Sequence, residues 1–167
     1  KPSIHDSLKT IESAKAMEQY LRYKKGFYDA TASHEINNGK HKAKITYNIV
    51  TGKRYKLGSL TYFSKDTTLL RHVVSVAPLS LLTPGEGLDA DRFELEKARI
   101  VNYLQNQGYA DFAANYISVK GDSTSGNFSV DVIMDILLPD GKTKHPVYRN
   151  GNIAVYTDHY HKQDTSD

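Results

Sequence analysis

An internal repeat with a long period is the feature that most limits what this chain can fold into. Residues 20–27 and 103–109 both start with Tyr-Leu at helix-like spacing and close on Gly followed by an aromatic residue. Residues 55–63 and 148–156 both keep a Tyr, a basic residue, a Gly and alternating apolar positions. The similarities occur in the same order, with offsets of 82 to 93 residues. They therefore indicate tandem units of about 80 to 90 residues rather than the short period of a solenoid.

Composition is typical of globular domains and excludes several classes of function. Hydrophobic residues make up 39% and charged residues 25% of the chain, as in ordinary soluble folds. No apolar run approaches the roughly 18 residues of a transmembrane helix, and residues 1–6 lack the apolar stretch of a signal peptide. The absence of Cys excludes disulfides, Cys zinc sites and thiol nucleophiles. A net charge of +3 is too small to indicate nucleic-acid binding.

One complete unit is predicted from about residue 53 to residue 138. Its first strand, 54–63, is rich in Tyr and apolar residues, and Gly58 interrupts the alternation as a β-bulge would. A helix follows, with Asp66 as its N-cap and apolar residues at helical spacing until Pro78. The unit therefore opens with a strand and a helix.

A second helix is predicted after a loop at 79–88 that contains Pro and Gly. Asp91 is the expected N-cap, and Glu94 stands where a capping box requires an acidic residue. Gly108 is expected to end this helix in a left-handed conformation, with Tyr109 making the hydrophobic contact beyond it.

Two strands complete the unit. Residues 110–120 alternate apolar and polar side chains, and residues 128–138 place six apolar side chains on one face. The order strand, helix, helix, strand, strand predicts an α+β fold in which two helices pack on one face of a three-stranded mixed sheet. The first strand is free to pair in parallel with the last, which leaves 110–120 at an edge.

Residues 1–51 repeat only the second half of the unit. We expect a helix at 7–25, strands at 28–36 and 42–50, and a turn at 37–39 between them. The last of these strands lacks its expected parallel neighbour, so a strand exchanged with a second copy is one way to complete the unit.

Residues 141–167 repeat only the opening strand, expected at 144–156, followed by a tail. The chain is therefore divided into a partial unit at 1–51, a complete unit at 52–140 and the start of a further unit, or a connector, at 141–167.

The order of these motifs resembles the POTRA domain of the BamA/TamA family of outer-membrane assembly and translocation proteins. The helix ends at 20–27 and 103–109, the Gly-x-x-Tyr-x-x-Gly-x-Leu sequence at 52–60 and the helix-linking loop at 82–89 carry the resemblance. Segments within 145–158 are similar to the lipoprotein TamA-like branch. The resemblance covers nearly the whole chain, and it implies that a barrel outside these residues anchors the parent protein.

The resemblance implies a periplasmic module that binds unfolded outer-membrane proteins or accessory envelope proteins without catalysis and without a cofactor. A free edge strand suits such a role, because an extended client can add to it by β-augmentation. The candidate partner-binding residues are Ala110, Phe112, Ala114, Tyr116 and Ser118 along one strand, and Tyr28, Ala30, Ala32 and His34 along the other. A plainer interpretation keeps Phe112 and Tyr116 in the core, with only their backbone available to a client.

Catalytic and metal sites have weak support. His159 and His161 have a spacing that can hold a metal, but no third ligand is indicated. Asp131 and Asp135 share a strand face, where acidic residues more often keep a strand soluble. No Gly-x-Ser-x-Gly motif is present. The sequence therefore predicts neither an enzyme nor a metal protein.

Two other functions stay open. The units can act as a spacer that sets the distance of a membrane barrel or a partner and binds no client. They can also recognise one dedicated substrate, as in two-partner secretion. Saturable pairing of assorted extended peptides with an edge strand separates client binding from both alternatives.

Overall fold

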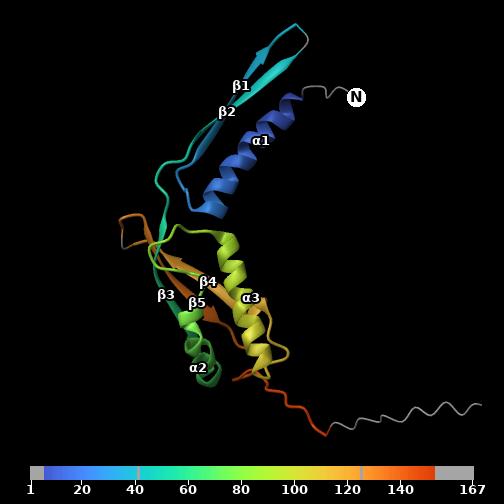
Figure 1. Ribbon diagram of the computed structural model, residues 1–167, viewed down its shortest axis with the longest axis vertical. Coiled ribbons are helices and arrows are strands. Elements are labelled where there is room, and N and C mark those ends of the chain that lie inside the picture. The colour runs from blue at the N-terminus through green and yellow to red at the C-terminus, as the bar shows by residue number, and fades with distance from the viewer. Residues whose placement is uncertain (1–5, 41, 125, 153–167) are drawn as a thin grey trace, which may run out of the picture.

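The computed structural model describes residues 6–40, 42–124 and 126–152. Within these residues the chain forms two lobes set end to end (Figure 1). The N-terminal lobe holds one α-helix and a two-stranded sheet, and the C-terminal lobe holds two α-helices and a three-stranded sheet. The α+β class predicted from the order of elements is confirmed, whereas the unit boundaries at 51 and 140 stay predictions.

The N-terminal lobe begins with helix α1, Ser7–Gln19, which continues through a π-helical turn at Tyr20–Lys24. The carboxylate of Asp6 accepts the N–H of Leu8 at 3.0 Å and so caps the helix. Gly26, with φ of +74°, ends it. This helix matches the prediction for 7–25.

Strands β1, Thr31–Asn38, and β2, Ala43–Val50, form an antiparallel hairpin. The predicted turn at 37–39 was wrong, because Asn37 and Asn38 still pair with β2 in the ladder. The chain instead turns after β1, where Gly39 N–H donates to the carbonyl of Lys42 at 2.8 Å.

The C-terminal lobe contains strands β3, Lys56–Ser64, β4, Ile117–Asp122, and β5, Ser129–Ile136. Their order is β3-β5-β4, with β3 parallel and β4 antiparallel to β5. The predicted mixed sheet, with the last strand in the centre, is confirmed. The pairing of β3 shifts between Leu57 and Leu60, so the predicted bulge at Gly58 is present.

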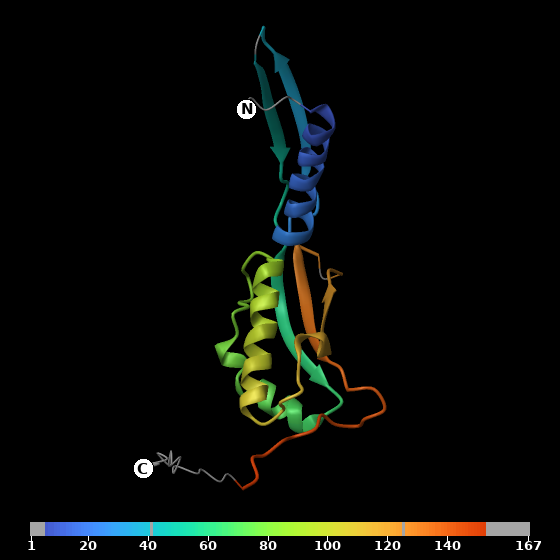
Figure 2. The ribbon, with the colours of Figure 1, turned by 90° about the vertical axis from the view of Figure 1, so that its right-hand side faces the viewer.

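Helices α2, Thr67–Ser75, and α3, Ala90–Asn106, cover one face of this sheet (Figure 2). Asp66 caps α2 as predicted, and its carboxylate accepts two backbone N–H groups at 3.1 Å. Gly108 follows α3 with φ of +95°, and Tyr109 beyond it is buried, both as predicted.

The N-cap of α3 is Asp89, and the prediction of Asp91 was wrong. Asp89 has an extended backbone, and its carboxylate accepts the N–H of Asp91 at 3.1 Å. Asp91 lies inside the first turn and pairs with Lys25 of the other lobe. Glu94 pairs with Lys97 rather than completing a capping box.

The core of the C-terminal lobe fills the space between the two helices and the sheet. Its fully buried side chains include an aromatic ring from the segment before β4 as well as residues of every helix and central strand. The core comprises Leu57, Leu69, Val73, Leu82, Leu88, Ile100, Leu104, Tyr109, Phe112, Ile117, Val130, Val132, Met134 and Ile136.

The segment after β5 packs back onto this lobe, and residues 144–152 form no strand. The predicted opening strand is therefore wrong over these residues, and the rest of it lies outside the described residues. His145 anchors the segment, because its N–H donates to the carboxylate of Asp66 at 3.0 Å. The His145 ring lies against Phe112 and Tyr116, with centroid distances of 5.0 and 4.9 Å. These contacts hold the segment in an irregular conformation.

Candidate protein-binding edge

The three-stranded sheet has two outer strands, β3 and β4. A loop covers the start of β3, because Leu57 N–H donates to Glu86 at 2.8 Å and its carbonyl accepts the N–H of Gly85 at 2.7 Å. In the described part of the chain, β4 pairs with β5 on one side and with no strand on the other. The strand before the last is thus an open edge strand, as predicted (Figure 2).

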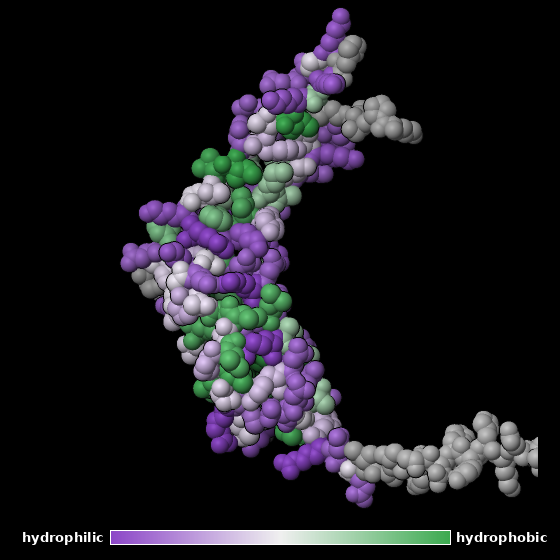
Figure 3. Space-filling view, in the orientation of Figure 1, coloured by the Kyte–Doolittle hydropathy of each residue, from purple (hydrophilic) through white to green (hydrophobic). Residues whose placement is uncertain are grey.

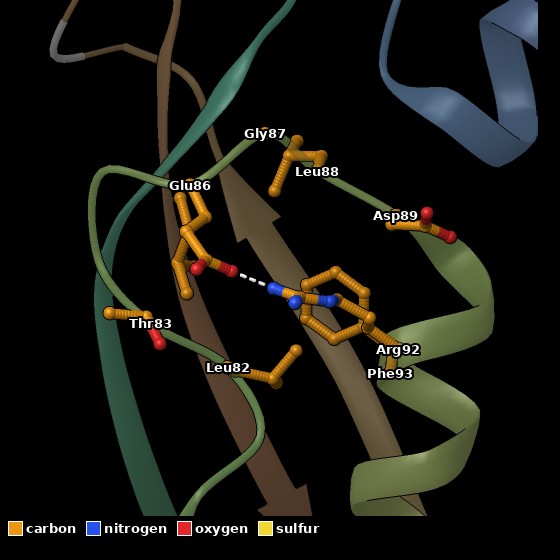
Figure 4. Close-up of a pocket in the computed structure, with 9 residues that line it drawn as sticks. Leu82, Thr83, Glu86, Gly87, Leu88, Asp89, Arg92 and Phe93 are labelled. Atoms are coloured by element: carbon orange, nitrogen blue, oxygen red, sulfur yellow. Dashed lines mark ion pairs between the residues drawn. The ribbon is translucent and has the colours of Figure 1, made fainter.

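The loop over β3 leaves no room for a ligand beneath it. Leu82, Leu88 and Phe93 lie under the loop, and an ion pair between Glu86 and Arg92 ties it to α3 (Figure 4). The enclosed space is about 10 Å³, enough for about one water molecule. The packed loop therefore closes the start of the β3 edge.

Backbone alternation determines which groups of β4 are free. The carbonyl of Tyr116 accepts the N–H of Leu137 at 2.8 Å, so it points toward β5. In an antiparallel ladder, the N–H and C=O of successive residues point to opposite sides of the strand. The backbone of Ser118 therefore faces β5, whereas the backbone groups of Val119 and Gly121 face the open edge.

The face of β4 that is turned toward the helices lines a groove. Val119 and Gly121 form one wall of it, Ala90 and Phe93 of α3 form the other, and Val132 of β5 lies between them. The space measures about 210 Å³. An added strand at β4 would place every second side chain over this groove. We predicted that the neighbouring helix would form the second wall of such a groove, and α3 lies in the position that this requires.

Four of the five residues predicted to form this edge lie outside β4. Ala110 and Phe112 belong to a turn and loop, and Ala114 and Tyr116 form a 3₁₀ turn before β4 begins. Ser118 is on the strand, but with its backbone toward β5. The prediction of a strand from residue 110 was wrong because the alternation reflects core burial of the loop rather than an extended strand. The edge residues are one position out of register with the predicted set.

The second predicted edge, on β1, is partly occupied by α1. The carbonyl of Ala30 accepts a hydrogen bond from Arg22 at 2.6 Å, and the N–H of Ala32 donates to Glu18 at 3.2 Å. The strand begins three residues later than predicted, and Ala30 is buried. His34 is half-buried on the strand itself. A client would have to displace the Glu18–Arg22 pair from the start of this edge.

Charged groups join the two lobes at the waist, where hydrophilic residues cross the molecule (Figure 3). The Lys25 ammonium lies 2.8 Å from Asp89 and 3.0 Å from Asp91. Arg54 donates to the carbonyl of Lys25 at 2.8 Å. The hydrogen bond from Lys25 holds the pKa of Asp89 below its usual range. The carboxylate therefore stays ionised, and the pair persists at mildly acidic pH.

Close packing reinforces these ion pairs. Tyr55 N–H donates to the carbonyl of Gly26 at 2.8 Å. A Cβ atom at Gly26 would lie 2.9 Å from that of Leu88, so this position has no room for a side chain. Tyr28, which lies in a turn rather than in the predicted strand, stacks edge-on against Tyr55 with ring centroids 4.9 Å apart. The two lobes are thus joined by a backbone hydrogen bond, an aromatic contact and ion pairs.

The same backbone contact recurs at the far end of the C-terminal lobe. Tyr148 N–H donates to the carbonyl of Gly108 at 2.7 Å. Tyr148 and Tyr55 are equivalent in the sequence repeat, as are Gly108 and Gly26. The repeat therefore includes a defined contact between a helix end and the segment that follows its unit.

Replacing Lys25 with Met should loosen the junction. The substitution keeps the length of the side chain but removes both ion pairs. We expect the two lobes to share one alignment tensor in residual dipolar couplings of the wild type and to need two in the variant. Lys15→Met, at an exposed position of α1, is the matched control. A single shared tensor in the Lys25 variant would show that packing alone fixes the junction.

A buried polar cluster in the C-terminal lobe is structural. Glu96 is fully buried, and its carboxylate accepts hydrogen bonds from Arg99, from Tyr62 at 2.9 Å and from the N–H of Leu81 at 2.9 Å. Burial alone would raise the pKa of Glu96, but hydrogen bonds led by Arg99 outweigh it and lower the pKa. Its oxygens are engaged in tying helix, strand and loop together.

Among the described residues, no cluster of three or more His, Asp or Glu side chains could hold a metal ion. His159 and His161 lie outside these residues, so the prediction of no metal site stays a prediction. No helix in the described ranges is long and apolar enough to cross a membrane.

Within the described residues, these features define a class of module: a strand-helix-helix-strand-strand unit with β4 as an open edge strand, joined end to end to a smaller lobe of one helix and a β-hairpin. The chain matches no protein-family profile. A comparison with curated proteins also finds no match.

A comparison with solved structures does find matches. One is POTRA domains 3–5 of BamA from Haemophilus influenzae, with 16% identity and a TM-score of 0.49 over 81% of this chain and 52% of that one. Another is BamA from Haemophilus ducreyi lacking POTRA domains 1–3, with 16% identity and a TM-score of 0.46 over 82% of this chain and 24% of that one. The chain spans about half the length of the first structure.

Proposed function

We propose that the chain is a POTRA-like part of a periplasmic arm of an outer-membrane protein, and that it binds extended segments of unfolded outer-membrane or accessory proteins without catalysing a reaction. The observation that supports this proposal most is the open edge of β4. Its free backbone groups lie beside a groove whose other wall is a helix. No cofactor, metal or nucleic acid has a part in it.

Strand addition explains how one site can accept many sequences. The hydrogen bonds come from the client backbone, which is the same in every sequence, and alternate side chains meet the groove. Of the edges considered, β4 is the most suitable, because a loop covers the start of β3 and side chains of α1 occupy the start of β1.

A backbone-amide chemical-shift titration with extended peptides tests this function. We expect saturable shifts in β4, at 117–122, and in the facing part of α3, with weak affinity typical of a chaperone-like contact. Peptides of unrelated sequence with alternating apolar residues should all bind. Binding of a single cargo alone would favour two-partner secretion instead.

A spacer is the second candidate, because the junction is tightly built. Lys25, Arg54 and Gly26 fix one lobe against the other through ion pairs, hydrogen bonds and close packing. A module that sets distance and orientation needs such a joint. The absence of shifts in β4 at millimolar peptide would favour this function over client binding.

A further inference from the structure

The groove beside β4 does not end within the C-terminal lobe. At the waist, Tyr23 and Tyr28 of the N-terminal lobe line the same space as Phe93 and Val119. The space is thus continuous with the interface between the lobes, near the contact of Gly26 with Leu88. Neither lobe forms this pocket without the other.

The rim of the pocket is apolar and charge-balanced. Tyr23 is 72% exposed and Val119 is 36% exposed, so apolar surface faces solvent where a burying partner would gain free energy. The cationic groups nearby are already paired, since Lys24 lies 3.7 Å from Asp91 and Lys25 lies 2.8 Å from Asp89. The pocket therefore offers no free charge to an ionic ligand and fits an uncharged one.

The volume of the pocket further limits which group can occupy it. The space of about 210 Å³ is smaller than the roughly 300–1,000 Å³ of sites for small-molecule ligands. It suits one bulky side chain. Because Tyr23, Tyr28 and Phe93 line it, an aromatic ring would gain edge-to-face contacts that an aliphatic chain cannot make.

We propose that the pocket shared by the two lobes is a subsite for one aromatic side chain of the extended segment that pairs with β4. The inference rests on the proposed function, because the bound strand delivers the ring. Val119 and Gly121 connect the edge to the pocket. Their backbone groups face the open edge of β4, and their side-chain positions line the pocket. A client held this way touches both lobes, and the fixed junction keeps the subsite in register with the edge.

The test uses two capped peptides of alternating apolar sequence that differ only in a central Phe or Ala. Titrated into the full chain, the Phe peptide should bind about 10- to 100-fold more tightly, as expected for burial of one aromatic side chain. Tyr23→Ser should lower this ratio by about threefold or more. Phe63→Ser is the matched control, because it removes a half-exposed ring on β3 away from the pocket and should leave the ratio unchanged.

The outcomes separate the subsite from the function on which it rests. Equal affinities for the two peptides, with shifts along β4, would overturn the aromatic subsite and leave strand addition intact. An unchanged ratio in Tyr23→Ser would overturn the sharing of the pocket between lobes. The absence of shifts along β4 with either peptide would overturn both the subsite and the proposed function.

Discussion

Replacing Glu96 with Ala is expected to lower the free energy of unfolding by about 3–5 kcal/mol, the usual cost of removing one partner of a buried ion pair. The substitution leaves Arg99, the hydroxyl of Tyr62 and the N–H of Leu81 without their shared acceptor. Chemical denaturation followed by circular dichroism measures the loss. A loss below about 1 kcal/mol would mean that water replaces the carboxylate at little cost.

Glu96→Gln is the matched variant, because it keeps the shape and loses the charge. It should be destabilised less than the Ala variant at neutral pH. Since the folded-state pKa of Glu96 is lowered, its contribution is complete above the unfolded pKa of about 4.3 and disappears as pH falls through the folded value. The difference in stability between wild type and Glu96→Gln should therefore shrink as the pH falls below about 4.

Replacing Phe112 with Ala should be equally severe. Phe112 is 1% exposed, its ring packs on His145 at 5.0 Å, and truncation of a buried Phe costs about 3–5 kcal/mol. Thermal unfolding monitored by near-ultraviolet circular dichroism checks the loss. The variant should retain peptide binding in its folded fraction, because Phe112 does not reach the open edge.

Ala114→Ser is the control for Phe112. This neighbour is exposed, so its substitution should change stability by no more than about 0.5 kcal/mol. If Phe112→Ala were as mild as this control and weakened peptide binding instead, the prediction that residues 110–120 form the binding edge strand would be restored.

The order of elements could be predicted because each has a strong local signal. The alternation along β5, the capping carboxylate of Asp66 and the helix-ending Gly108 each depend on a few adjacent residues. Parallel pairing of β3 with β5 followed from connectivity, since the two helices between them make a crossover. These features need no knowledge of distant contacts.

The candidate site was harder to predict from the sequence, because it depends on the register of β4. Phe112, Ala114 and Tyr116 alternate as a strand does, yet tertiary contacts with His145 turn them into an irregular loop. The strand then starts at Ile117, and Val119 and Gly121 rather than Ser118 meet the edge. Likewise, the local sequence predicts Asp91 as the helix N-cap, but in the structure Asp91 pairs with Lys25 of the other lobe. Contacts between residues far apart in the chain leave no local pattern in a single sequence.

The most direct test of the central claim compares proline at two neighbouring positions of β4. Val119→Pro removes an N–H that faces the open edge, where proline is tolerated in sheets. Ser118→Pro removes an N–H that faces β5, so it breaks a ladder hydrogen bond and should cost about 1–3 kcal/mol of stability. We expect Val119→Pro to stay folded and to bind extended peptides at least about tenfold more weakly than wild type in the amide titration. Wild-type affinity in the folded Val119→Pro variant would show that clients do not pair with β4 and would contradict the account.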